Sequence, residues 1–259
     1  MICAIEDILR KAGALMLSYG NPEVYQKEGR ANFVTEADVA VQACLMEQLA
    51  ARYPGARFFA EEKDDNVLTG DLTFIIDPID GTLNYLRGRA CSMISVGAVQ
   101  GKQAVFGAIY DPYRDLLFHA ETGCGAWCGS DRLHVSDVPC ESAVINLGTA
   151  HYVEGTLEKT ARSVAGVLGT FGDLRRLGAA TRDLTDIAIG QSEGSFEWML
   201  NPWDYCAGSL IVTEAGGRCG NIMGGDITYA HAIPFMAATP RVYDTLQRVL
   251  QDAASDAQS

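Results

Sequence analysis

Two stretches near the start of the chain carry apolar residues at the spacing of one helix face. Over residues 4–19 these are Ile5, Ile8, Leu9, Ala12, Leu15, Met16 and Tyr19. Over residues 35–53 they are Val41, Cys44, Leu45 and Leu49. Thr35 and Asp38 stand at nearly the spacing of a capping box before the second stretch. The pattern predicts two amphipathic helices, joined by a loop over the polar residues 21–33.

The middle of the chain contains short apolar runs separated by turn residues, which is typical of strands. Runs at 57–60 and 72–76 predict two buried strands. Three further strands are expected at 91–100, 103–111 and 115–120. Because only short turns separate these three, we expect an antiparallel meander. The glycine-rich residues 122–129 predict a turn into a short strand near 132–135.

Past Pro139, segments with the apolar pattern of a strand alternate with segments that have the apolar spacing of a helix. Strands are expected near 143–149, 174–177, 194–198, 217–221 and 234–238. Helices are expected near 156–170, 180–191, 204–215 and 240–253. Such alternation favours a layered α/β arrangement. We therefore expect an N-terminal part, 1–140, and a C-terminal α/β part, 141–259.

Composition narrows the class of protein. The 259 residues are 48% apolar and 20% charged, as in globular chains that bury a large core. No tract is long enough to cross a bilayer, and the N-terminus lacks the basic and apolar regions of a signal peptide. We expect a cytoplasmic protein with no membrane partner. The eight cysteines form no C-x-x-C pair and, with the four histidines, no zinc pattern.

The formal net charge of −13 is unfavourable for a nucleic-acid-binding surface, so no nucleic-acid partner is expected. It also means that an anionic substrate needs bound cations to be attracted.

One acidic motif, Asp77 to Thr82 with the sequence DPIDGT, follows the strand expected at 72–76. Pro78 cannot donate to a strand ladder, so we expect the chain to leave the sheet there. Asp80 follows one short turn later. Two carboxylates this close repel each other unless cations neutralise them, and magnesium prefers such oxygen ligands together with phosphate oxygens. A lone motif of this kind is usually a turn, but with other acidic motifs it indicates a metal and phosphate site.

Three further acidic positions occur at the ends of predicted elements. Glu61 and Glu62 follow the strand at 57–60, Asp38 lies at a helix start, and Asp204 lies at another. Each has an ordinary interpretation, as a solvated loop or as a helix cap. At the exit of a strand in an α/β sheet, however, ligands gather.

Together the motifs resemble the inositol monophosphatase family of lithium-sensitive, magnesium-dependent phosphatases. Four segments carry the resemblance: Val34 to Asp38, Glu61 to Glu62, Asp77 to Tyr85, and Trp203 to Gly217. Their order and separations fit the family from about residue 4 to residue 250. The resemblance implies an α/β (α+β) fold, a layered α-β-α-β-α sandwich, and a homodimer.

The resemblance also implies a set of ligands for two or three Mg²⁺ ions. Glu61, Asp77 and the backbone carbonyl of Ile79 would hold the first ion. Asp77, Asp80 and Asp204 would hold the second, and Glu61 would touch a third, weaker one. Glu61 and Asp80 would in this way be catalytic.

Roles towards the substrate follow from the same resemblance. Asp38 and Thr82 would orient the attacking water, and the amides of Gly81 and Thr82 would bind the phosphate. Glu197 would accept hydrogen bonds from substrate hydroxyls, and Asp204 would lie against the substrate.

Departures from the family pattern concern the substrate side. Ala60 and Leu83 replace a glycine and a threonine that are common in relatives. Arg182 and Asp183 bring charge to the helix expected to face the substrate, and Asn201 falls in the stretch expected to contact the alcohol.

We therefore expect a magnesium-dependent phosphoric monoester hydrolase for inositol monophosphate or a related small sugar phosphate. Alternatives with the same chemistry are fructose 1,6-bisphosphate, a 3′-phosphoadenosine-type nucleotide and histidinol phosphate. A different alternative is a non-catalytic protein that binds RNA or transcription machinery. The complete acidic set is unfavourable for that alternative.

Overall fold

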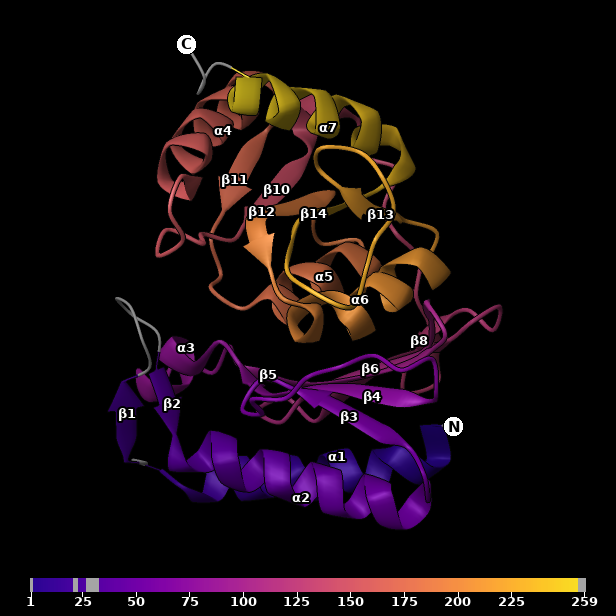
Figure 1. Ribbon diagram of the computed structural model, residues 1–259. Helices are drawn as coiled ribbons and strands as arrows, with labels where there is room; N and C mark the ends of the chain where they lie inside the picture. Colours follow the sequence, from indigo (N-terminus) through magenta and orange to yellow (C-terminus); the bar gives the residue numbers. More distant parts are fainter. Residues whose placement is uncertain (1, 21–22, 27–32, 256–259) are drawn as a thin grey trace.

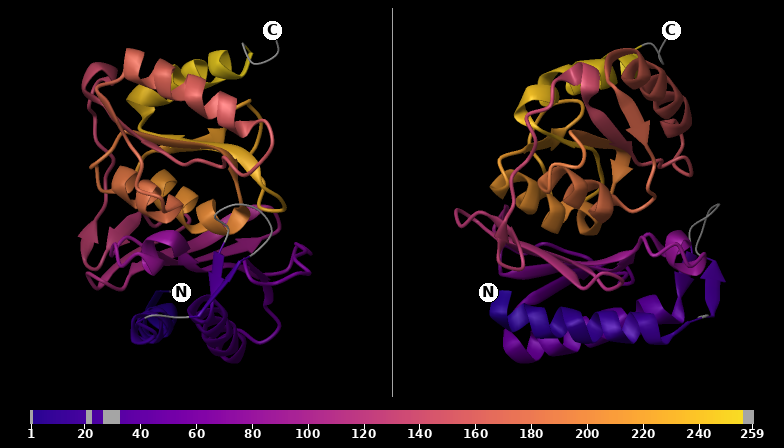
Figure 2. Two further views of the ribbon diagram at one scale, coloured as in Figure 1. Left: turned by 90° about the vertical axis from the view of Figure 1, so that its left-hand side faces the viewer. Right: turned by 180° about the vertical axis from the view of Figure 1, so that it is seen from behind.

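The computed structural model describes residues 2–20, 23–26 and 33–255, which form five layers (Figures 1 and 2). One outer layer consists of α1 (Ile2–Ser18) and α2 (Glu36–Arg52). The opposite outer layer consists of α4 (Thr156–Thr170) and α7 (Pro240–Ser255). Between two sheets lie α5 (Ala180–Ala188) and α6 (Pro202–Glu214). The predicted α-β-α-β-α sandwich is confirmed.

The first sheet has seven strands in the order β3-β4-β5-β6-β7-β8-β9. Their bounds are β3 Arg57–Ala60, β4 Thr73–Asp80, β5 Met93–Gln100, β6 Gln103–Asp111, β7 Leu116–Glu121, β8 Ala126–Cys128 and β9 Asp131–Arg132. Only the β3–β4 pair is parallel, and the antiparallel meander is confirmed. The short strand expected near 132–135 is confirmed in part: β9 covers Asp131–Arg132 and forms a hairpin with β8, and residues 133–135 lie beyond it.

The second sheet has five strands in the order β11-β10-β12-β14-β13. Their bounds are β10 Val144–Leu147, β11 Asp173–Arg175, β12 Gly194–Leu200, β13 Arg218–Asn221 and β14 Ile233–Ala238. Strand β10 is parallel to both of its neighbours, as helical crossovers require. One sheet thus uses strands before residue 140 and the other uses strands after it. The division into two parts near residue 140 stays a prediction.

Helix α6 is apolar on all sides because sheets lie on both sides of it. Tyr205, Ile211 and Val212 are fully buried in a cluster that also contains Ile109 of the first sheet and Phe235 of the second. An all-round apolar helix is stable only in such an interior position. The two sheets are therefore held together through the middle helices.

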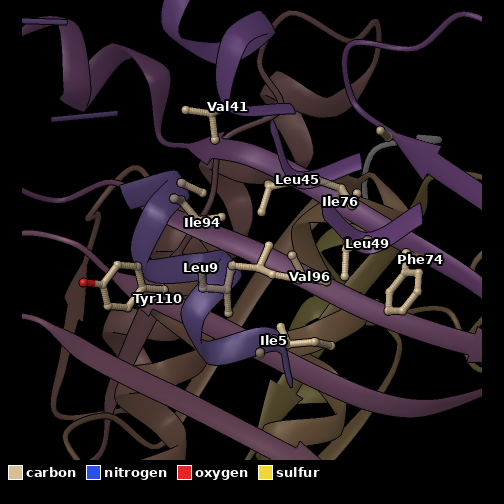
Figure 3. Close-up of a cluster of buried hydrophobic side chains, with 14 of the residues drawn as sticks. Ile5, Leu9, Val41, Leu45, Leu49, Phe74, Ile76, Ile94, Val96 and Tyr110 are labelled. Carbon is tan, nitrogen blue, oxygen red and sulfur yellow. The ribbon is translucent and has the colours of Figure 1, made fainter. Parts of the chain in front are cut away.

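The amphipathic faces predicted near the N-terminus pack against the first sheet (Figure 3). Ile5 and Leu9 of α1 and Leu45 of α2 point towards Ile76 of β4 and Val96 of β5. All five side chains are fully buried. This packing fixes α2, whose first turn carries Asp38, against the sheet that carries Asp77.

The loop expected over residues 21–33 is partly wrong. Strands β1 (Val24–Gln26) and β2 (Phe33–Thr35) form a short antiparallel pair, and residues 21–22 and 27–32 lie outside the described residues. Within the described ranges no helix is both long and apolar enough to cross a membrane. The seven cysteines described are free thiols.

Candidate functional site

A cleft lies where the carboxyl ends of parallel strands from both sheets meet. It is lined by residues that follow β3, β4, β10 and β11, by the last residue of β4 and by residues of α5, β12 and α6: Glu61, Asp80, Gly81, Thr82, Leu83, Gly148, Thr149, His151, Tyr152, Arg176, Gly178, Ala179, Ala180, Asp183, Glu197, Leu200 and Asp204. The carboxyl ends of strands are where α/β sheets gather ligands. The exits of β3 and β4, singled out in the sequence by their acidic residues, both reach this cleft.

A β-bulge, rather than an exit from the sheet, places the two aspartates of the DPIDGT motif. Asp77 pairs with Ser95 and Asp80 pairs with Met93, so three steps along β4 match two along β5. The expectation that the chain leaves the sheet at Pro78 is therefore wrong. A bulge tolerates proline because it interrupts the ladder, and it re-aims the side chains beside it.

A second bulge lies on the opposite wall of the cleft. Glu197 pairs with Phe235 and Leu200 pairs with Ile233, again three steps against two. The Glu197 carboxylate lies so close to Gly148, at the end of β10, that a Cβ atom on Gly148 would overlap it. Each sheet thus contributes one irregular strand and one redirected acidic side chain to the cleft.

Three carboxylates meet at the cleft, and two of them, Asp80 and Asp204, line it. One oxygen from each of Asp77, Asp80 and Asp204 lies within 4.8 Å of the other two. Each carboxylate is anchored through one of its oxygens. The amide of Ile79 donates to Asp77 at 3.0 Å, and the amide of Asn201 donates to Asp204 at 2.9 Å.

The third anchor comes from the start of α5. The amide of Thr181 donates to Oδ2 of Asp80 at 2.6 Å, and the hydroxyl of Thr181 donates to the same oxygen. Thr181 was not singled out in the sequence, since no local pattern shows that the start of this helix reaches β4.

The site strongly disfavours the ionised form of its own carboxyl groups. Burial raises the pKa of Asp77 well above its usual value, and four neighbouring carboxylates raise it further. These neighbours are Glu61, Asp80, Asp204 and Asp38. Burial likewise raises the pKa of Asp204, and it raises that of Asp80 in spite of the Thr181 donors. A hard divalent cation fits this donor set, because it would neutralise charges that the chain leaves uncompensated.

Glu61 reaches the cluster through the parallel pairing of β3 and β4. Ala60 pairs with Ile76, and the amide of Glu61 donates to the carbonyl of Ile76 at 3.1 Å. Glu61 thus enters the cleft beside Asp77. Glu62 is turned differently, with its amide donating to Gln42 of α2 at 3.0 Å.

Asp38 combines a capping role with nearness to the cluster. The amide and the hydroxyl of Thr35 donate to its Oδ2 at 2.7 and 2.6 Å, so the capping box expected from the sequence is present. Asp38 is fully buried and does not line the cleft, but its charge raises the pKa of Asp77. Asp38 therefore has a second interaction besides capping α2, namely charge repulsion with Asp77.

Asp204 also belongs to a capping box, in which it is the third helical residue and not the N-cap. Asn201 caps α6, and Pro202 opens the helix. Asn201 was expected to contact the alcohol part of a substrate, but it bonds Asp204 and does not line the cleft.

The turn after Asp80 requires glycine. Gly81 has φ +81°, and a Cβ atom there would come within 3.0 Å of Ala179 and 3.1 Å of the Cys91 carbonyl. Short helix α3 (Thr82–Leu86) follows. The hydroxyl of Thr82 donates to the carbonyl of Ile79 at 3.2 Å. Gly81 and Thr82 both line the cleft, whereas Ile79 is buried below it.

The wall opposite the aspartates is acidic too. Burial raises the pKa of Glu197 to about 8, with a further rise from Asp80 that Arg176 opposes. Asp183 is 2% exposed, and its Oδ1 has no hydrogen-bond partner among the described residues. Burial raises the pKa of Asp183 well above its usual value. This wall can accept several hydrogen bonds from a bound molecule.

Of the two charged residues noted on the substrate-facing helix, only Asp183 lines the cleft. Arg182 points elsewhere, with its guanidinium 2.8 Å from Asp186 and 3.9 Å from Asp111 of β6. Arg176 and the half-exposed Tyr152 line the cleft, and neither was singled out in the sequence.

Comparison with known proteins relates the sequence of the chain to one protein family. A model of the inositol monophosphatase family matches residues 1–255. The Nus factor SuhB of Escherichia coli strain K12 is 32% identical over 254 residues, covering 96% of this chain and 94% of that protein. An inositol-1-monophosphatase of Rhizobium meliloti is 32% identical over 225 residues, covering 85% of each.

A solved structure agrees with these relatives. The crystal structure of the extragenic suppressor protein suhB from Bartonella henselae superimposes with a TM-score of 0.89 at 30% identity, covering 96% of this chain and 98% of that one. The chain belongs to the inositol monophosphatase family. The family supports a phosphatase enzyme that acts on phosphorylated small molecules.

Proposed function

We propose that the chain is a magnesium-dependent phosphomonoesterase that hydrolyses inositol monophosphate or a related small sugar or polyol phosphate. The observation that carries this proposal is that carboxylate oxygens of Asp77, Asp80 and Asp204 lie within 4.8 Å of one another at a cleft that Glu61 and Thr82 also line. Such a cluster of buried carboxylates is stable as anions only with cations.

Asp77, Asp80, Asp204, Glu61 and the carbonyl of Ile79 would hold two or three Mg²⁺ ions. Bound there, magnesium would supply positive charge to the phosphate and promote the ionisation of water. The orientation of each aspartate side chain is fixed, because one of its carboxylate oxygens accepts hydrogen bonds. The donors are the amide of Ile79 for Asp77, the amide of Asn201 for Asp204, and the amide and hydroxyl of Thr181 for Asp80. The site is thus arranged before a ligand arrives.

Thr82 and Asp38 would orient the water that attacks phosphorus. The Thr82 hydroxyl donates its hydrogen to the carbonyl of Ile79, so its oxygen can accept a hydrogen bond from a water molecule. The amides of Gly81 and Thr82, at the turn into α3, would bind phosphate oxygens. No protein nucleophile is needed, and positioning and charge supply the catalysis.

Glu197 would bind the alcohol part of the substrate. It is redirected into the cleft by the bulge in β12 and lies against Gly148. Asp183 adds a buried acceptor on the same wall, and the half-exposed Tyr152 also lines the cleft. An acceptor-rich wall suits a molecule with several hydroxyl donors, such as inositol.

Three further properties belong to this proposal through the family: inhibition by lithium, a homodimer and a place in the cytoplasm. The name Nus factor that the Escherichia coli relative carries favours a second candidate function, interaction with transcription machinery. Binding of the purified chain to purified RNA polymerase would test it, and an Asp80→Asn variant should bind equally well.

A phosphate-release screen tests the main proposal. The purified chain, supplied with Mg²⁺, is given inositol 1-phosphate, sugar phosphates, histidinol phosphate, 3′-phosphoadenosine-type nucleotides and p-nitrophenyl phosphate. We expect release, with the highest kcat/KM for a polyol or sugar phosphate. No release from any ester would refute the proposal.

A further inference from the structure

Arg176 is the single arginine or lysine among the described residues that line the cleft. It follows β11, and its side chain is exposed. The Nε and Nη2 atoms donate to the hydroxyl of Thr149 at 3.1 and 2.9 Å. One edge of the guanidinium is therefore held by a neutral group from the loop after β10.

The other edge of the guanidinium remains available to a ligand. Arginine has five N–H donors, and within the described part of the chain Thr149 takes two of those of Arg176. The Nη1 atom lies beside Gly178, a cleft residue without a side chain, 3.5 Å from where a Cβ atom would stand. The absence of a side chain at Gly178 leaves this edge open.

Neighbouring arginines are used differently. Arg175 forms an ion pair with Asp173 at 2.5 Å, and Arg182 forms one with Asp186 at 2.8 Å. No ion pair of Arg176 with a carboxylate occurs among the described residues, although Glu197 and Asp183 lie near enough to feel its charge. A fixed guanidinium with an open edge is suited to a phosphate or carboxylate group.

We propose that Arg176, held by Thr149, forms a second anion subsite, so that the preferred substrate carries a phosphate or carboxylate in addition to the phosphate that is hydrolysed. This rests on the proposed phosphatase function, because the aspartate cluster is taken as the place of the hydrolysed phosphate. The substrate class is then a sugar or polyol phosphate with a further anionic group.

Matched substrate pairs test this subsite and identify the anion. Fructose 1,6-bisphosphate and fructose 1-phosphate differ by one phosphate, and 2-phosphoglycerate and glycerol 2-phosphate differ by one carboxylate. Kinetic constants are measured for the unaltered chain, Arg176→Gln, Arg176→Lys and the control Arg175→Gln. We expect Arg176→Gln to reduce the preference for the partner that carries the second anionic group by about ten- to a hundredfold, mainly through KM.

The pattern across variants separates the subsite from a structural role. Arg176→Lys should keep part of the preference, and Arg175→Gln should keep all of it. An effect in the fructose pair alone assigns a phosphate, and an effect in the glycerate pair alone assigns a carboxylate. Equal losses on both members of each pair would overturn the proposal, because Arg176 would then serve only Glu197 and Asp183. No preference in the unaltered chain would overturn it as well.

A binding experiment keeps the subsite testable without turnover. Alkylphosphonates and ω-carboxyalkylphosphonates of equal length cannot be hydrolysed, and calorimetry with the magnesium-loaded chain gives their dissociation constants. We expect tighter binding of the carboxylated series at one chain length, lost in Arg176→Gln. Such binding without release of phosphate from any ester would refute the phosphatase and retain the subsite. Equal binding of the two series at every length, together with no preference for fructose 1,6-bisphosphate over fructose 1-phosphate, would refute the proposed subsite.

Discussion

Thr181 at the start of α5 donates both its amide and its hydroxyl to one oxygen of Asp80, 101 residues earlier in the chain. The two residues come from different layers, a middle helix and the seven-stranded sheet. Their contact joins the wall that faces the alcohol part of a substrate to the proposed metal cluster. Asp80 can present its other oxygen in a fixed direction because of it.

Thr181→Val should weaken magnesium binding by about ten- to a hundredfold, as is typical when a residue that orients a ligand is lost. Valine keeps the shape of the fully buried side chain and removes only the hydroxyl. Calorimetric titration with Mg²⁺ measures the change, and Thr181→Ser is the control that should restore most of the affinity. Equal magnesium affinities for the valine variant and the unaltered chain would mean that the hydroxyl does not orient Asp80.

Without metal the chain should lose stability as the pH rises above about 4, where carboxyl groups of an unfolded chain ionise. The folded pKa values of Asp77, Asp80 and Asp204 are raised, chiefly by burial. Between the unfolded and the folded pKa the native state binds more protons, so the free energy of unfolding falls with pH. Melting curves in EDTA from pH 5 to pH 8 measure this, and Mg²⁺ should flatten the slope.

Asp80→Asn provides a matched comparison for that experiment. It removes one buried charge with little change of shape, so it should raise the metal-free melting temperature at pH 8 by about 2–4 °C for each kcal/mol of relieved repulsion. The gain should be smaller at pH 5. A variant that melts below the unaltered chain at both pH values would show that Asp80 does not repel its neighbours.

Above pH 8, where Glu197 with its pKa of about 8 is ionised, Glu197→Gln should raise KM for inositol or sugar phosphates by about ten- to a hundredfold, because a charged acceptor is lost. It should have little effect on p-nitrophenyl phosphate, which offers no hydroxyl. Gly148→Ala should act in the same way, since its Cβ atom would displace the Glu197 carboxylate. Overpacking of this kind also costs about 1–3 kcal/mol of stability. Equal losses on both substrates would assign Glu197 to the metal site or the fold.

Thr82→Ala should lower kcat by about a hundredfold or more with little change in magnesium affinity, because positioning of water acts in the transition state. Thr82→Ser should retain most of the activity. A loss that excess Mg²⁺ restores would instead assign the hydroxyl to the support of the Ile79 carbonyl, to which it donates.

The apolar pattern predicted most of the helices and strands, because helix faces and strands repeat with different periods, whereas the order of the five layers came from the family resemblance. Strand β4 is buried along its whole length and includes the apolar run Phe74 to Ile76, and α6 includes the buried apolar run Leu210 to Val212, whereas α1 is amphipathic. Pro78 misled the prediction because proline ends a regular ladder but also fits a bulge. Only the pairing of Asp77 and Asp80 with β5 distinguishes the two cases.

The acidic cluster could be predicted because its residues lie in short recognisable motifs. The wall opposite could be predicted only in part: Glu197 and Asp183, both expected on the substrate side, line the cleft, but the other contacts of this wall join distant segments. Nothing local shows that Arg182 turns to Asp111 while Arg176 turns into the cleft. The same applies to Thr181, whose partner lies on another layer.

Release of phosphate from inositol 1-phosphate, followed first in excess EDTA and then during a titration with Mg²⁺, tests the central claim most directly. We expect negligible release in EDTA, a saturable return with Mg²⁺, and at most a few per cent of that activity in Asp80→Asn. The magnesium-binding carboxylates would then be essential for turnover. Full release in EDTA, or an Asp80→Asn variant as active as the unaltered chain, would contradict a magnesium-dependent mechanism at this cluster.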